Sequence, residues 1–134
     1  MSDASITAVF AARMRAARKA LGISQAELGV RMGLSEDVAS TRINRYEKDK
    51  SPPSVQTMRE IAAVLGLPLA ALIVESERIA KANILLALMS DEDQEAQVAS
   101  MLRKVDKRKA EKACAVLQTA TPPAKNKETK RRTP

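Results

Sequence analysis

The spacing of apolar residues predicts helices along most of the chain. Residues 5–21 carry apolar side chains at intervals of three or four, which form one face of a helix. These are Ile6, Phe10, Met14, Ala17 and Leu21. Gly22 follows directly and is well placed to end this helix, since glycine accepts the left-handed conformation common at helix C-termini.

Residues 24–50 predict two short helices that meet at a glycine. Ser24 can cap the first helix, with Glu27 three residues later as the second half of a capping box. Gly33 suits a sharp turn, and a second helix is expected from Ser35 to about Glu47. Residues at helical spacing then share its inner face, namely Ala39, Ile43 and Tyr46. The polar residues between them are left on the other faces.

Two further segments complete a first domain. The prolines of KDKSPPS end the preceding helix, and Ser54 can cap a helix that closes at Gly66. The apolar segment PLAALIVE then predicts one more short helix. We therefore expect a compact all-α domain of five helices over residues 5–74.

The character of the chain changes after residue 74. Residues 75–118 predict a helical extension, with a break near Val105 and three acidic residues, 91–93, in one first helical turn where the helix dipole favours them. Residues 119–134 combine prolines and basic residues with almost nothing to bury, so we expect a disordered basic tail there.

Composition narrows the classes of function. The net charge is +7 and the pI about 9.9, which suits a polyanionic partner such as nucleic acid or an anionic membrane surface. Histidine is absent, which removes the commonest general base and zinc ligand, so we expect no enzyme, metal or cofactor. The single Cys114 excludes an intramolecular disulfide, and no apolar run is long enough to span a bilayer. A cytoplasmic protein is expected.

The signature residues fall in a known order. They are Arg18, SQAEL at 24–28, Gly33, NRYEKDK at 44–50, Pro52 and TMREIAAVLGLP at 57–68. With them, residues 10–73 resemble the Cro and phage-repressor type of the helix-turn-helix family, also called the xenobiotic-response-element family. The resemblance implies a five-helix lambda-repressor-like DNA-binding domain. It also implies a dimeric transcriptional repressor that reads a palindromic operator through the major groove, in a bacterial or phage context and associated with the nucleoid.

The resemblance also assigns roles to single residues. Gln25 would bridge a DNA phosphate and a side chain of the recognition helix, and Gly29 would be the small residue at which the two helices pack closely. Arg18 and Glu47 match a partly buried ion pair, and Gly33 is the turn glycine. Asp49 stands where the family usually has glycine, and aspartate is one of the few other residues that accept a left-handed conformation.

One departure affects the DNA-reading residues. Between Ser35 and Ile43 this chain has about four residues more than the family norm, which adds about one helical turn. An alignment anchored on Ile43 makes the base-reading residues Ser40, Thr41, Arg42 and Arg45. An alignment anchored on Ser35 would select Glu36 and Asp37, which phosphates would repel, so the first is preferred. Candidates for phosphate contact are Gln25, Asn44, Lys48, Lys50 and Arg59.

Dimerisation requires apolar surface outside this motif. We assign it to PLAALI and to the helices after residue 78, whose apolar residues include Leu85, Leu86, Met89, Val98 and Leu102. The alternative is that these residues pack back onto the first domain. Two other functions fit: an antitoxin whose C-terminal helices bind a toxin as protein partner, and an interaction adaptor that reads no DNA. The arginines at 42 and 45 argue against the adaptor.

Overall fold

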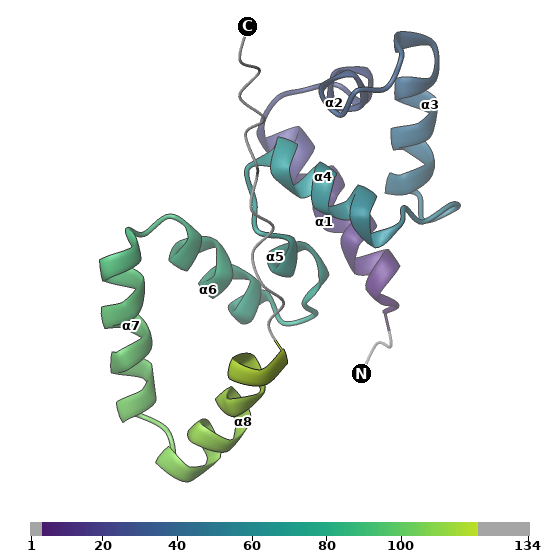
Figure 1. Cartoon of the computed structure of the whole chain (residues 1–134). Coiled ribbons are helices and arrows are strands. Elements are labelled where there is room, and N and C mark those ends of the chain that lie inside the picture. The colour runs from purple at the N-terminus through teal and green to yellow at the C-terminus, as the bar shows by residue number, and fades with distance from the viewer. Residues whose placement is uncertain (1–3, 121–134) are drawn as a thin grey trace, which may run out of the picture. The chain divides into compact units, whose positions relative to one another are not determined.

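A computed structural model describes residues 4–120 of the protein, and every regular element among them is an α-helix (Figure 1). The helices are α1 (Ile6–Ala20), α2 (Gln25–Arg31), α3 (Glu36–Glu47), α4 (Val55–Leu65), α5 (Leu69–Ile73), α6 (Glu77–Ala87), α7 (Asp91–Arg103) and α8 (Lys107–Ala120). The all-α class and the five helices of the first domain are confirmed. None of the described helices is both long and apolar enough to cross a bilayer.

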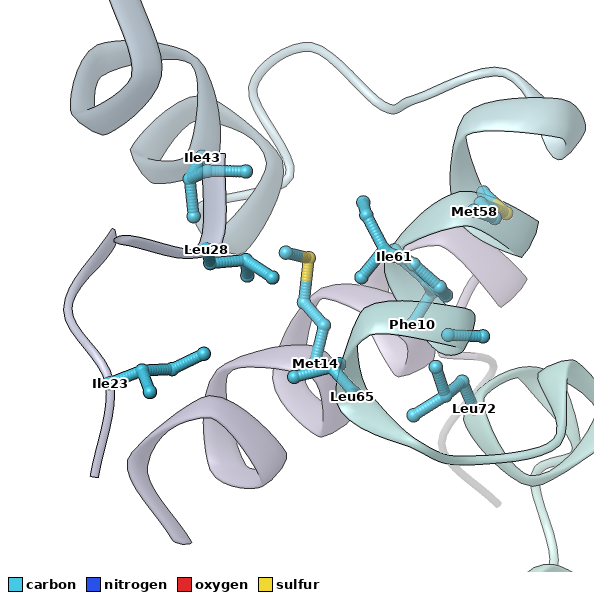
Figure 2. Close-up of a cluster of buried hydrophobic side chains, with 10 residues drawn as sticks. Phe10, Met14, Ile23, Leu28, Ile43, Met58, Ile61, Leu65 and Leu72 are labelled. Atoms are coloured by element: carbon cyan, nitrogen blue, oxygen red, sulfur yellow. The ribbon is translucent and has the colours of Figure 1, made fainter. Parts of the chain in front are cut away.

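The core of the first unit is built by α1 to α5. Its largest fully buried side chains are Phe10, Met14, Leu28, Ile43, Ile61 and Leu72. In Figure 2 the Met14 side chain points into the space between Leu28 and Ile61. With one Phe in the whole chain, aliphatic side chains supply most of this core. Each buried side chain of this size contributes about 1.5–3 kcal/mol.

Serines begin most of the helices of this unit. The side chains of Ser5, Ser24, Ser54 and Ser76 each accept a hydrogen bond from the backbone N–H three residues later. These bonds satisfy amides that the first turn of a helix leaves free. Ser35, before α3, makes no such side-chain bond.

The chain divides into two units, residues 1–90 and 91–134. The boundary predicted after residue 74 stays a prediction, and α6 lies in the first of these two units. Arg13 of α1 holds the segment that leads into α6. Its guanidinium donates to the carbonyls of Ala71 (2.8 Å), Val74 and Glu75 (3.0 Å), and so fixes the end of α5 and the start of the link to α6.

The second unit consists of α7 and α8, separated at residues 104–106, where the sequence predicts a break. The side chain of Asp106 accepts a hydrogen bond from the Lys109 N–H (3.0 Å) and begins α8. No residue of α7 is buried. The helix α8 extends to Ala120, so it includes the first two residues of the predicted tail, and residues 121–134 lie outside the described part of the chain.

Candidate functional site

The site is built on α2 and α3, which cross at Gly29. A Cβ placed on Gly29 would lie 2.6 Å from the Cβ of Ala39 and 2.9 Å from its Cα. Real side chains do not approach this closely, so the crossing requires glycine at this position of α2. Ala39 belongs to the extra turn of α3, residues 36–39, which lies between Ser35 and the helical turn that leads to Ile43. This extra turn therefore contributes to the packing against α2.

The turn between the two helices depends on Gly33. This residue has a φ of 92°, which is accessible to glycine and strained for other residues. The Leu34 N–H donates to the Gly29 carbonyl (3.0 Å), and the Gly33 N–H donates to the Val30 carbonyl (2.9 Å). This is the Schellman arrangement that ends a helix and redirects the chain. Asp49, just after α3, also has a positive φ, of 52°.

An ion pair fixes the other end of α3. The Nε of Arg18 lies 2.5 Å from Oε1 of Glu47, and its Nη1 donates to the Ile23 carbonyl at 2.9 Å. Both residues are only 9% exposed. Gln25 joins them, because its side-chain amide donates to Oε2 of Glu47 (2.9 Å) and to Oδ1 of Asn44 (3.3 Å). The last turn of α1, the start of α2 and the end of α3 are therefore held by one polar network.

The packing of α3 leaves one face open. Ala39, Ile43 and Glu47 are buried and Tyr46 packs against the core, whereas residues 40–42 and Arg45 are exposed. A shallow hollow of about 520 Å³ lies against the outward face, and Asp37, Thr41, Arg42 and Arg45 line it together with residues 51–54. The hollow is thus bordered by two arginines and by the polar loop that precedes α4.

The residues predicted to contact nucleic acid occupy three places. Ser40, Thr41, Arg42 and Arg45 are exposed on α3. Gln25 and Asn44 are half-buried and bonded to each other. The other three are exposed: Lys48 at the end of α3, Lys50 in the loop after it and Arg59 on α4. The hollow joins Thr41, Arg42 and Arg45 but does not include Ser40.

The hollow includes one residue that the sequence does not predict as a DNA contact. Asp37 carries a charge that phosphates repel, yet it lines the same hollow as Thr41 and Arg45. The spacing of four residues between Asp37 and Thr41, and again between Thr41 and Arg45, could have revealed this. Within residues 4–120 no group of histidine, cysteine or acidic side chains is arranged to bind a metal ion.

Comparisons with known proteins agree with this geometry. A helix-turn-helix family model matches residues 14–72. Among solved structures, the chain is similar to the transcriptional regulator BswR, with 28% sequence identity and a TM-score of 0.63. That similarity covers 71% of this chain and 93% of BswR, so it extends beyond the segment that the family model matches. No curated protein matches the chain.

Proposed function

Through residues 14–72 the chain belongs to the Cro and phage-repressor type of the helix-turn-helix family, and from this premise we propose a dimeric repressor that reads a palindromic DNA operator. The helix-turn-helix is a DNA-binding domain and not an enzymatic one. In the proposal, α3 is the recognition helix that enters the major groove, and each subunit of the dimer reads one half-site.

The observation that carries the proposal is the contrast between the two faces of α3. Its inner face is fixed by Ala39, Ile43 and the Arg18–Glu47 pair. On its outer face, neither Arg42 nor Arg45 forms an ion pair with any described residue. A fixed helix that carries arginines with free guanidinium groups suits bidentate hydrogen bonding to O6 and N7 of guanine.

The neighbouring residues fit complementary roles. Thr41 can contact the methyl group of thymine, and Ser40 can bond to either kind of base edge. Lys48, Lys50 and Arg59 would bind phosphates, which fix the position of the protein without reading sequence. Gln25 donates both hydrogens of its amide to Glu47 and Asn44, so the amide that this network would hold towards a phosphate in a fixed orientation is the Nδ2 of Asn44.

Replacing Arg42 or Arg45 with alanine is expected to change which operators the protein selects. In selection from a random double-stranded DNA pool, each variant should lose the preference for guanine at one position per half-site, because one bidentate contact contributes about 1–3 kcal/mol of discrimination. Arg59→Ala is the matched control. It should weaken binding to all sequences alike, since a phosphate contact carries no sequence information.

A selected motif that is the same for the wild type, Arg42→Ala and Arg45→Ala would show that the base-reading residues lie elsewhere. Failure of the wild type to enrich any motif would contradict sequence-specific binding itself.

Dimerisation is proposed to involve α7 and α8, with a second copy of the chain as the partner. No residue of α7 is buried, and its apolar side chains Val98, Met101 and Leu102 are 40–43% exposed. Two helices without a buried core are not stable alone, and bundles bury such apolar faces between helices. A palindromic operator requires two-fold pairing of subunits, and the same helices of a second copy would provide the missing core.

Ending the chain after Ser90 tests this assignment. The first unit keeps its complete core, so the shortened protein should fold, and light scattering should give the mass of a monomer where the full chain gives a dimer. Its affinity for a full palindrome should fall towards that for a half-site, because the two domains are no longer linked. A shortened protein that dimerises as strongly as the full chain would place the interface within residues 1–90.

A further inference from the structure

Asp37 occupies the same row of α3 as two of the proposed DNA-reading residues. Asp37, Thr41 and Arg45 follow one another at intervals of four, so they lie along one side of the helix. All three are exposed and all three line the hollow beside α3. Asp37 forms no ion pair with any described residue, so its carboxylate is available to an external partner.

A carboxylate in the major groove can only accept hydrogen bonds. Guanine presents two acceptors there and thymine presents one together with a methyl group, so both repel or exclude it. Adenine places its amino donor beside the N7 acceptor. Cytosine alone presents an amino donor, N4, without an acceptor on the same base. A carboxylate that reaches the base edges in the major groove therefore favours cytosine over the other three bases.

We propose that Asp37 is a specificity-determining residue that accepts a hydrogen bond from cytosine N4 at one position of each half-site. The inference rests on the proposed function, because it requires α3 to lie in the major groove. The repulsion between Asp37 and the phosphates lowers affinity for every DNA sequence alike. This repulsion therefore leaves the preference among bases unchanged. The same negative charge disfavours bases that present hydrogen-bond acceptors.

The row also sets an approximate spacing for the bases it reads. Asp37 and Arg45 are eight residues apart, which corresponds to about 12 Å along the helix axis. Base pairs are stacked about 3.4 Å apart. The cytosine read by Asp37 should therefore lie about three to four base pairs from the guanine read by Arg45.

A purely structural role for Asp37 makes a different prediction. Acidic residues in the first turn of a helix stabilise it through the helix dipole, and Ser35 provides no side-chain cap to α3. Glu36 is in the same turn, is also exposed and carries the same charge, but as the neighbouring residue it points about 100° away from Asp37 around the helix. Glu36→Gln is thus a matched control, with the same loss of charge on a different face.

The test is selection from a random double-stranded DNA pool with the full-length wild type, Asp37→Asn and Glu36→Gln. The wild type should enrich cytosine at one position per half-site, and replacing that cytosine should weaken its binding by about tenfold. Asp37→Asn should lose this preference and favour adenine there, because asparagine can bond to both N6 and N7 of adenine. Glu36→Gln should select the wild-type motif. Both variants should bind non-specific DNA more tightly than the wild type, since each removes one negative charge.

Three results would overturn the inference. The first is an Asp37→Asn variant that selects the same cytosines as the wild type. The second is a Glu36→Gln variant whose selected motif changes in the same way as that of Asp37→Asn, and the third is a wild-type motif in which no cytosine is enriched. Thermal unfolding of both variants shows whether either has lost its fold. A wild type that selects no motif at all would instead contradict the proposed function, so the two failures are distinguishable.

Discussion

Replacing Glu47 with alanine is expected to lower the free energy of unfolding by about 3–5 kcal/mol. The substitution leaves the guanidinium of Arg18 buried without a counter-charge, and Gln25 also loses the carboxylate to which its amide donates. The remaining bond of Arg18, to the Ile23 carbonyl, does not neutralise its charge. Urea denaturation, with the midpoint and slope compared with those of the wild type, measures the loss.

Glu27→Ala provides the control for this prediction. Glu27 pairs with Arg31 on the surface of α2, where the side chains are 46% and 49% exposed. Solvent screens such a pair, so its loss should cost less than about 1 kcal/mol. The Ser24 cap is unaffected, because it binds the backbone N–H of Glu27. If Glu47→Ala cost no more than Glu27→Ala, burial of the Arg18–Glu47 pair would have little energetic significance.

The Arg18–Glu47 network also connects stability to the proposed function. Glu47 is the last residue of α3, and its partners come from α1 and from the start of α2. Loosening this end of α3 would let the outward arginines move relative to the rest of the domain. We therefore expect DNA affinity of Glu47→Ala to fall even at temperatures where the protein remains folded, since base contacts require fixed geometry.

Most helices of the first unit could be predicted because their signals are local. Apolar residues at intervals of three or four identify the inner faces, and Ser24, Ser54 and Gly66 mark helix ends through bonds to residues only a few positions away. The attachment of α6 could not be predicted in this way. The link to α6 is held by Arg13, whose acceptors lie 58 to 62 residues later in the chain, and an arginine gives no sequence signal for backbone carbonyls so distant.

The candidate site shows a similar limit. The outward positions of Thr41, Arg42 and Arg45 followed from placing Ile43 in the core. The sequence also shows the extra turn before Ile43, but the negative charge of Glu36 and Asp37 argues against DNA contact there. Charge governs attraction to phosphates, whereas base selection depends on which hydrogen-bonding groups the side chain offers. The hollow that contains both Asp37 and Arg45 is a property of the folded helix and of the loop beside it.

Replacing Gly29 with alanine is expected to destabilise the protein although alanine is the better helix former. In an open helix the change would add about 1 kcal/mol of stability. Here the new methyl group would lie 2.6 Å from the Cβ of Ala39 and 2.9 Å from its backbone Cα, so α2 and α3 must separate. Overpacking typically lowers the free energy of unfolding by about 1–3 kcal/mol, and we expect a net loss in the upper part of this range. Urea denaturation measures it. DNA affinity should fall as well, because α3 is displaced relative to α1 and α2.

Ala39→Gly separates this clash from other effects of the substitution. Alone it should cost about 1 kcal/mol through the low helix propensity of glycine. Combined with Gly29→Ala it removes the closest contact, so the double variant should be more stable than the sum of the two single changes implies, by about 0.5–3 kcal/mol. The recovery should be partial, because the backbone Cα of residue 39 remains 2.9 Å from the new methyl group. Strict additivity, or a Gly29→Ala variant more stable than the wild type, would mean that α2 and α3 do not require this close approach.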